Sequence, residues 1–147
     1  MFPDIDTLAA RLRGHRLPGG EYRISIAESR QVARLSGFEA SQPHPVFSSV
    51  VTLKALGVSI EQLCDLCEFR LEDGPMLGEF TTRFFQPLEQ DVRYTTNATI
   101  ESIDRAHSAR AGVLDRLRFA VHICLPNGAV AAEVRYLWLL PRGKAEH

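Results

Sequence analysis

The chain has 147 residues, 17 of them Lys or Arg and 18 Asp or Glu, which leaves a net charge of −1. This length suits one domain with one core. With 45% hydrophobic and 24% charged residues, the composition excludes a disordered chain and a fibrous repeat. Because the balanced charge provides no overall basic field, nucleic acid is not an expected partner.

Local composition also indicates the cellular compartment in which the protein is expected. No apolar run approaches the roughly 18 residues that span a bilayer. The opening residues, Met1 to Asp4, lack the basic and apolar regions of a signal peptide. Three cysteines are too few for a disulfide framework and are typical of a reducing compartment. We therefore expect a cytoplasmic protein with free thiols and no membrane segment.

The N-terminal third alternates between helix and strand signals. Leu8 and Leu12 have helical spacing within residues 5–13, so residues 1–19 are expected to form a leading helix and loop. Period-two alternation predicts a first strand over residues 22–26. Residues 28–35 are expected to be helical, ending at Gly37, before a loop that runs to His44.

Two further helices are predicted in the middle of the chain. Residues 45–56 are apolar on most sides, which indicates a buried helix, with Pro45 at its first position and Gly57 at its end. Ser59 can cap an amphipathic helix over residues 60–69. The first of these helices is expected to be enclosed by a sheet on one side and by a partner subunit on the other.

The C-terminal half consists of predicted strands. Residues 79–85, 92–104, 113–125 and 129–140 are rich in Val, Ile, Thr, Phe and Tyr. Asn127-Gly128 favours an antiparallel hairpin with a type I′ turn, in which both central residues need positive φ. With a frayed tail at residues 144–147, the chain is expected to be a single α+β hot-dog domain spanning residues 1–147. Its antiparallel sheet of about five strands would wrap around a long central helix.

The order of these segments resembles a single hot-dog domain of the MaoC-like hydratase/dehydratase superfamily, over about residues 20–143. The residues that carry the resemblance are His44-Pro45-Val46-Phe47, Phe84-Phe85-Gln86-Pro87-Leu88 with Asp91 and Tyr94, Arg105 with Ser108, Arg110 and Gly112, Asn127-Gly128 with Val130, and Trp138-Leu139-Leu140-Pro141-Arg142.

This resemblance implies a lyase activity on acyl thioesters. Water would be added to or removed from a 2-enoyl or 3-hydroxyacyl thioester of coenzyme A or acyl carrier protein, in fatty acid or polyketide metabolism. The family takes its acid and base from a D-x-N-P-x-H loop, with no cofactor or metal. The thioester oxygen is bound by backbone N–H groups at the start of the central helix, here Val46, Phe47 and Ser48. Such domains usually form homodimers or heterodimers, with the acyl chain between the subunits.

The catalytic loop of the family is altered in this chain, and two alignments are open. In one, Glu39 and His44 keep the carboxylate-to-imidazole spacing, while Ser41 replaces the motif's Asn and the Pro is displaced by one position. In the other, His44 matches the residue that opens the central helix in many members, and the whole hydratase loop is deleted. The first alignment makes His44 and Glu39 the catalytic pair, and the second removes both.

Further binding residues have two interpretations each. Ser48 and Ser49 can face a thioester or bond back to their own helix. Arg110, in a basic stretch with Arg105, Arg116, Arg118 and His107, can receive phosphates or an acidic carrier, although Asp104 and Asp115 make a solvated rim the simpler interpretation. The aromatic residues Phe84, Phe85, Tyr94, Tyr136 and Trp138 can line an acyl pocket or fill the core.

Two other features bear on whether the chain holds a metal ion or a catalytic carboxylate. Cys64, Cys67, His122 and Cys124 could supply four zinc ligands, but the first pair is one helical turn apart and suits an apolar core, so no metal is expected. Lys54 occupies a helix position where some hot-dog enzymes carry a catalytic carboxylate. The favoured function is therefore that of a MaoC-like hydratase or dehydratase. In a variant of this hypothesis, the chain is one subunit of a heteromer. An acyl-thioesterase and a non-catalytic binder of acyl thioesters or apolar ligands stay open.

Overall fold

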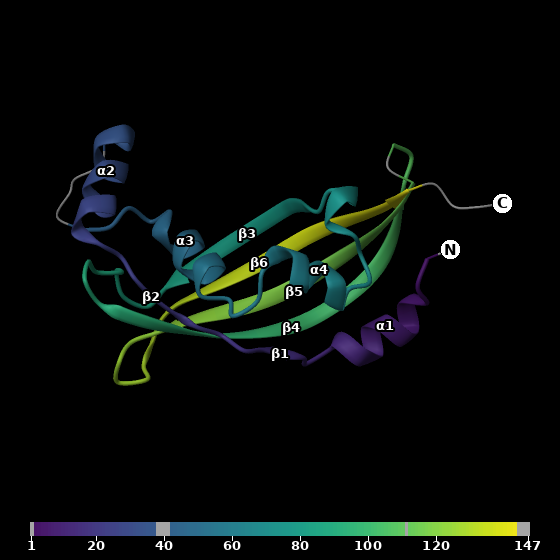
Figure 1. The fold of residues 1–147 in the computed structure, drawn as a ribbon, viewed down its shortest axis with the longest axis horizontal. Coiled ribbons are helices and arrows are strands. Elements are labelled where there is room, and N and C mark those ends of the chain that lie inside the picture. Colours follow the sequence, from purple (N-terminus) through teal and green to yellow (C-terminus); the bar gives the residue numbers. More distant parts are fainter. Residues whose placement is uncertain (1, 38–41, 111, 144–147) are drawn as a thin grey trace.

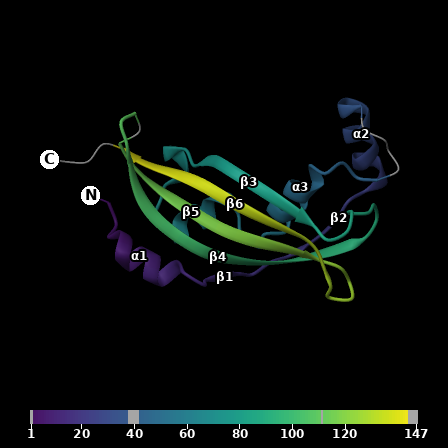
Figure 2. The ribbon, with the colours of Figure 1, turned by 180° about the vertical axis from the view of Figure 1, so that it is seen from behind.

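The computed structural model describes residues 2–37, 42–110 and 112–143. The helices of residues 26–66 lie on one face of a curved sheet, and the N-terminal helix lies beside the edge of that sheet, as Figure 1 and the reverse view in Figure 2 show. The helices are α1 (Ile5–Leu12), α2 (Ile26–Ser36), α3 (Phe47–Lys54) and α4 (Ile60–Leu66), with a short 3₁₀ helix η1 (Leu71–Asp73). The strands are β1 (Arg16–Leu17), β2 (Glu21–Arg23), β3 (Met76–Phe84), β4 (Arg93–Ser108), β5 (Gly112–Cys124) and β6 (Val130–Gly143).

All strand pairs are antiparallel, in the order β1-β4-β5-β6-β3, with β2 also pairing β4. The expected α+β architecture is confirmed, but the sheet has six strands instead of about five. The sheet has one more strand than expected because two short strands, β1 and β2, both pair with β4 along the same edge. Between them Gly19 has φ +74, and a Cβ there would lie 2.3 Å from the Thr96 carbonyl oxygen, so only glycine permits this approach.

The first predicted strand ends earlier than expected. Residues 22–26 were expected to be extended, but β2 stops at Arg23, and Ile26 already begins α2. Ser25 caps this helix: its side chain accepts the N–H of Glu28, whose carboxylate accepts the N–H of Ser25 in return. This reciprocal cap provides hydrogen bonds that a continued strand would not.

The central helix α3 is shorter than the long helix expected over residues 45–56. Its first turn is preceded by a tight turn in which Phe47 N–H bonds the His44 carbonyl at 2.9 Å. At the other end Ala55 leaves the helical region, and its carbonyl accepts the Thr96 hydroxyl. Phe47, Ser48, Val51 and Thr52 are buried against the sheet, so the expected buried face is confirmed.

The four long strands occur where the sequence predicts them, and β3, β4 and β6 extend further by three or four residues at one end. The hairpin at Asn127-Gly128 is antiparallel as predicted, but only Gly128 has positive φ. Leu125 accepts the N–H of Gly128 and donates to Ala129, which is a three-residue loop rather than a type I′ turn. Pro126 explains the difference, because its fixed negative φ favours a type I turn at this position.

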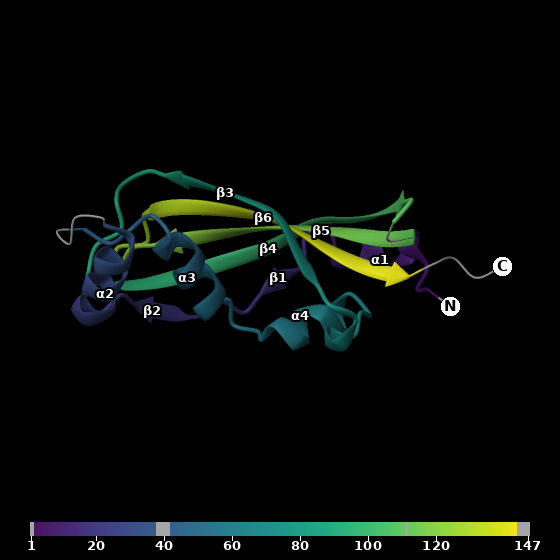
Figure 3. The same ribbon diagram turned by 90° about the horizontal axis from the view of Figure 1, so that it is seen from above.

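Seen from above, α2, α3 and α4 lie along one face of the sheet, while β3 forms a free edge (Figure 3). The core lies between these helices and the inward side chains of β4, β5 and β6, and Leu8 and Leu12 of α1 join it. No helix in the described ranges is both long and apolar enough to cross a bilayer.

Candidate functional site

His44 lies immediately before α3 and has a fixed orientation. Its Nδ1 atom accepts the N–H of Val46 at 3.0 Å. Because Nδ1 is the acceptor, the neutral ring carries its proton on Nε2. The side chain therefore caps the helix with Nδ1, and Nε2 is the nitrogen that carries the proton of the neutral ring. Glu39, its expected carboxylate partner, lies outside the described residues.

The backbone N–H groups expected to bind a thioester oxygen already have acceptors within the chain. Val46 donates to the ring of His44, Phe47 donates to the His44 carbonyl at 2.9 Å, and Ser48 donates to the Pro45 carbonyl at 3.1 Å. The helix start is therefore internally satisfied in this conformation. A ligand oxygen would have to share one of these donors or displace its acceptor.

Hydroxyl groups connect α3 to the sheet. Ser48 Oγ lies 2.9 Å from Thr82 Oγ1 on β3, and Thr52 Oγ1 lies 2.5 Å from the Tyr136 hydroxyl on β6. The Ser49 side chain also bonds the Tyr136 hydroxyl. Burial raises the pKa of Tyr136, and its hydrogen bonds to Thr52 and Ser49 oppose this shift. The Ser48 side chain thus bonds to the sheet and not back to its own helix, and the Ser49 side chain lies beside the Tyr136 hydroxyl.

An apolar pocket of about 380 Å³ adjoins the turn that contains His44. Residues on both sides of His44 line it, together with the segment that follows β3. The lining residues are Gln42, Pro43, Pro45, Phe84, Phe85, Gln86, Pro87 and Leu88. Phe84 and Phe85 are 40% and 52% exposed, so this wall of the pocket is open along the β3 edge.

The predicted aromatic residues divide into two groups. Phe84 and Phe85 line the pocket. Tyr94, Tyr136 and Trp138 are buried in the core, where the Tyr94 hydroxyl accepts the N–H of Glu89 at 2.7 Å. The core interpretation is therefore correct for Tyr94, Tyr136 and Trp138, whereas Phe84 and Phe85 line a pocket.

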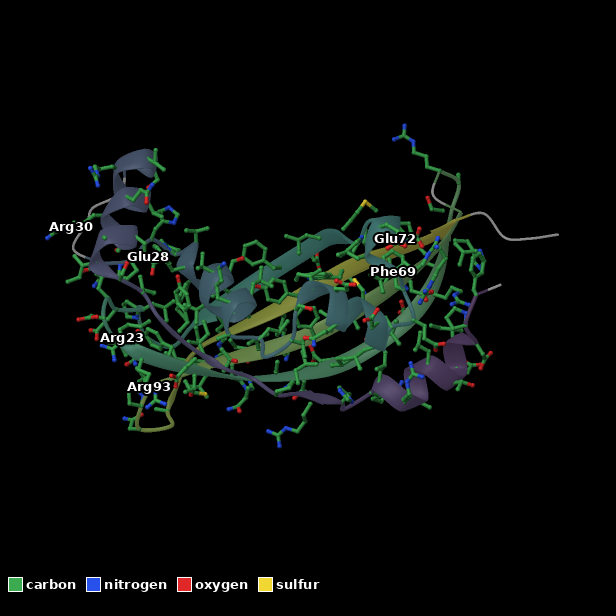
Figure 4. All side chains as sticks on the ribbon, in the orientation of Figure 1. Arg23, Glu28, Arg30, Phe69, Glu72 and Arg93 are labelled. Atoms are coloured by element: carbon green, nitrogen blue, oxygen red, sulfur yellow. The ribbon has the colours of Figure 1, made fainter. Side chains whose placement is uncertain are left out.

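Arg110 is not near the pocket of its own chain. It lies exposed at the turn between β4 and β5, at the end of β4 remote from α2 and α3 (Figure 1). The side chains labelled in Figure 4 mark the two ends: Glu28 lies on α2, with Arg23 and Arg93 on strands at the same end, whereas Phe69 lies beyond α4.

The basic stretch contains a buried ion cluster that the sequence analysis missed. The Asp115 carboxylate has no exposed surface and contacts Arg105 Nε at 2.7 Å and Arg142 Nε at 2.9 Å. Arg142 also donates to the carbonyls of Cys67 and Glu68, so it holds the end of α4 against β6. Arg105 and Asp115 therefore have a structural position instead of the solvated rim that was expected.

The cysteines are buried and free. Burial, the main cause, raises the pKa of Cys67 to about 12, and the pKa of Cys64 is raised as well. Across residues 2–37, 42–110 and 112–143, no three His, Cys, Asp or Glu side chains are grouped so that they could hold a metal ion.

Comparison with known proteins finds similarity only at the level of structure. No family model matches the chain, and no curated protein matches it. Among solved structures, the ChsH1-ChsH2 complex from Mycobacterium tuberculosis contains a chain with a TM-score of 0.66 at 11% identity, covering 97% of this chain and 91% of that one. Thioesterase superfamily proteins are also among the similar structures.

Two further similar structures are named as enzymes. An (R)-hydratase from A. caviae has a TM-score of 0.52 at 18% identity, with 88% of this chain and 96% of the other covered. A MaoC-like dehydratase from Phytophthora capsici has a TM-score of 0.63 at 10% identity, and this chain spans 51% of its length. Identities this low establish a fold and not an activity. The chain therefore has the hot-dog fold that MaoC-like dehydratases and thioesterase superfamily proteins share, as the resemblance implied.

Proposed function

We propose that the protein hydrates 2-enoyl thioesters, or dehydrates the corresponding 3-hydroxyacyl thioesters, as one subunit of a hot-dog dimer. One observation carries this proposal: an oriented histidine stands at the start of α3 beside an open apolar pocket. The pocket volume of about 380 Å³ suits an acyl chain. The named hydratase and dehydratase among the similar structures support the same class of reaction.

The hydrogen bond of His44 favours the role of donor for this residue, and we assign the role of base to Glu39. A neutral His44 with its proton on Nε2 is a hydrogen-bond donor, so it suits the thioester oxygen or the 3-hydroxyl group. The base would be Glu39. Its carboxylate would take a proton from water as the water oxygen bonds to C3, and the resulting carboxyl group would return this proton to C2. Atoms balance, and neither residue is altered after one turnover.

The remaining predicted binding residues contribute in different ways. The acyl chain would lie against Phe84 and Phe85, and the N–H groups of Phe47 and Ser48 would share their present bonds with the thioester oxygen. Arg110 is remote from this pocket in its own chain, so we assign it to the phosphates or acidic carrier at the partner's site.

The test is mass spectrometry of the protein incubated with 2-enoyl and saturated acyl-coenzyme A thioesters. Addition of water to the enoyl substrates, abolished by Glu39→Gln, is the expected result. Release of free coenzyme A would replace the proposal by a thioesterase. Hydration that Glu39→Gln leaves unchanged would contradict the role of Glu39.

A second candidate is a non-catalytic subunit that binds the acyl chain for a catalytic hot-dog partner. It is favoured by the internally satisfied N–H groups at the start of α3, which offer no free donor to a thioester oxygen. The ChsH1-ChsH2 structure is a complex of two different chains, which fits this arrangement. Tight binding of acyl thioesters without turnover would establish this candidate.

A further inference from the structure

Arg83, near the end of β3, is an exposed cation whose partner is an aromatic ring. Its Cζ atom lies 5.0 Å from the centroid of the Phe85 ring. Stacking on a ring orients a guanidinium group without neutralising its charge. Across residues 2–37, 42–110 and 112–143, no carboxylate forms an ion pair with Arg83. Arg83 therefore keeps its positive charge available to a ligand.

The carboxylate opposite Arg83 on β6 already has other partners. Glu133 is the cross-strand neighbour of Arg83, a position at which opposite charges commonly pair. The Glu133 carboxylate instead bonds Arg135 Nε at 2.6 Å and lies 3.6 Å from His122 Nε2. The hydrogen bond from Arg135, the largest cause, lowers the pKa of Glu133. The charge of Glu133 is thus compensated without Arg83.

A hollow of about 260 Å³ adjoins Arg83, and its lining residues are Thr81, Arg83, Glu133 and Arg135. Thr82 bonds Ser48 of α3, so its neighbours Thr81 and Arg83 point to the opposite face of the sheet. Two arginines and one glutamate give the lining a net positive charge. A guanidinium group and a hydroxyl donor match the two oxygens of a carboxylate, so the hollow suits an anionic group.

Phe85 connects this hollow to the apolar pocket beside His44. Phe85 lines the pocket, while its ring carries the guanidinium group of Arg83, which lines the hollow. The N–H of Phe85 donates to the Ala131 carbonyl at 2.8 Å, which holds the backbone in place at this point. A ligand whose apolar part lies in the pocket against Phe85 therefore has one end within reach of Arg83.

The proposed function determines which end of the ligand this is. Its thioester would lie at the start of α3 and its acyl chain against Phe84 and Phe85, so the group that passes Phe85 is the far end of the acyl chain. We propose that this acyl chain ends in a carboxylate, which binds the Arg83 guanidinium group and the Thr81 hydroxyl. The inference rests on the proposed function and names its substrate class, the ω-carboxyacyl thioesters.

The test is isothermal titration calorimetry with analogues of acyl-N-acetylcysteamine thioesters in which an N–H group replaces the thioester sulfur, so that nothing turns over. The ω-carboxy analogue should bind the wild-type protein about fivefold or more tightly than its ω-methyl ester. Arg83→Gln should abolish this preference and leave the affinity for the methyl ester unchanged, because the ester forms no ion pair. Arg83→Lys, which retains a cation, should keep part of the preference.

Arg30→Gln is the matched control for a change in net charge. Arg30 lies exposed on α2, labelled in Figure 4, and it too has no ion pair in the described part of the chain. Its loss should leave the preference for the carboxylate intact. The proposal is overturned if the wild-type protein binds both analogues equally, if Arg83→Gln retains the preference, or if Arg30→Gln removes it to the same extent.

Coenzyme A distinguishes a second source of anionic oxygens, because the N-acetylcysteamine analogues carry no phosphate. A neutral acyl group could bind better on coenzyme A than on N-acetylcysteamine, with this difference removed by Arg83→Gln and no effect of an ω-carboxylate. Arg83 would then hold phosphates, and the proposal would be overturned. Because the titration measures no turnover, hydration can fail while the carboxylate preference stands. Hydration without a carboxylate preference would refute this inference alone.

Discussion

The imidazole Nδ1 atom of His44 lies 3.0 Å from the backbone nitrogen of Val46, so this side chain caps α3 at a residue whose two neighbours, Pro43 and Pro45, line the candidate pocket. Asn and Gln each reproduce half of this arrangement. The oxygen of Asn can occupy the place of Nδ1, whereas the amide nitrogen of Gln can approach the place of Nε2.

We expect one variant to lose activity and the other to lose stability. His44→Asn should keep the unfolding free energy of the wild type but lose about a hundredfold or more in kcat, because it retains the cap and removes the donor. His44→Gln should lose about 0.5–2 kcal/mol of stability and keep more activity. Urea denaturation and hydration kinetics measure the two effects. If His44→Asn has full activity, Nε2 is not a catalytic group.

Asp115 and Asp104 form a matched pair for measuring the effect of burial on an ion pair. Both contact an arginine with the same bidentate geometry, 2.7 and 3.1 Å, but Asp115 has no exposed surface and Asp104 is 46% exposed. Asp115→Asn should cost about 3–5 kcal/mol because it leaves two buried guanidinium groups without a counter-charge. Asp104→Asn should cost about 1 kcal/mol or less. Equal losses in thermal or urea denaturation would contradict the structural role of the buried cluster.

The thiols should be inert in the folded protein. Because burial raises the pKa of Cys67 to about 12, almost no thiolate is present near neutral pH, and Cys64 and Cys124 are buried as well. A thiol-reactive dye should label the native protein slowly and all three cysteines rapidly in guanidinium. Rapid labelling of Cys64 or Cys67 in the native protein would show that the α4 region opens.

Alkaline pH should loosen the start of α2. The Tyr22 hydroxyl donates to the Glu28 carboxylate at 2.7 Å, and burial, then this contact, raises the pKa of Tyr22 from 10.0 to about 12. The folded state thus holds the phenol proton more strongly than the unfolded state does. This contribution to stability is complete below pH 10 and is lost as the pH rises through 12. Tyr22→Phe should show a smaller fall in unfolding free energy over this range; parallel curves would contradict the assignment.

The sequence predicted which segments form helices and strands more accurately than it predicted the residues at which they begin and end. The long strands follow directly from alternating apolar residues, because each strand has one face on the core. The first strand was extended too far because Ile24 and Ile26 alternate with polar residues. The Ser25-to-Glu28 spacing, a capping box, was present in the sequence and would have placed the start of α2 correctly.

The candidate site was harder to predict, for a physical reason. That Phe84 and Phe85 line a pocket depends on the residues at 42–45, which are remote in the sequence and brought close only by the fold. One signal was overlooked. Asp115 occupies an inward position between Val113 and Leu117, and a carboxylate there requires a buried partner. That partner is supplied in part by Arg142, which lies 27 residues away.

The position of β6 in the sheet affects the order in which the protein can fold. This strand is the last in the sequence, yet it lies between β5 and β3 and supplies the only strand partner that β3 has within the described chain. While the ribosome is still synthesising residues 130–143, β3 has no strand to join, and Phe80 and Phe84 are in contact with water. Sheet closure therefore has to wait until residues 130–143 have been synthesised, because β3 joins the sheet through β6.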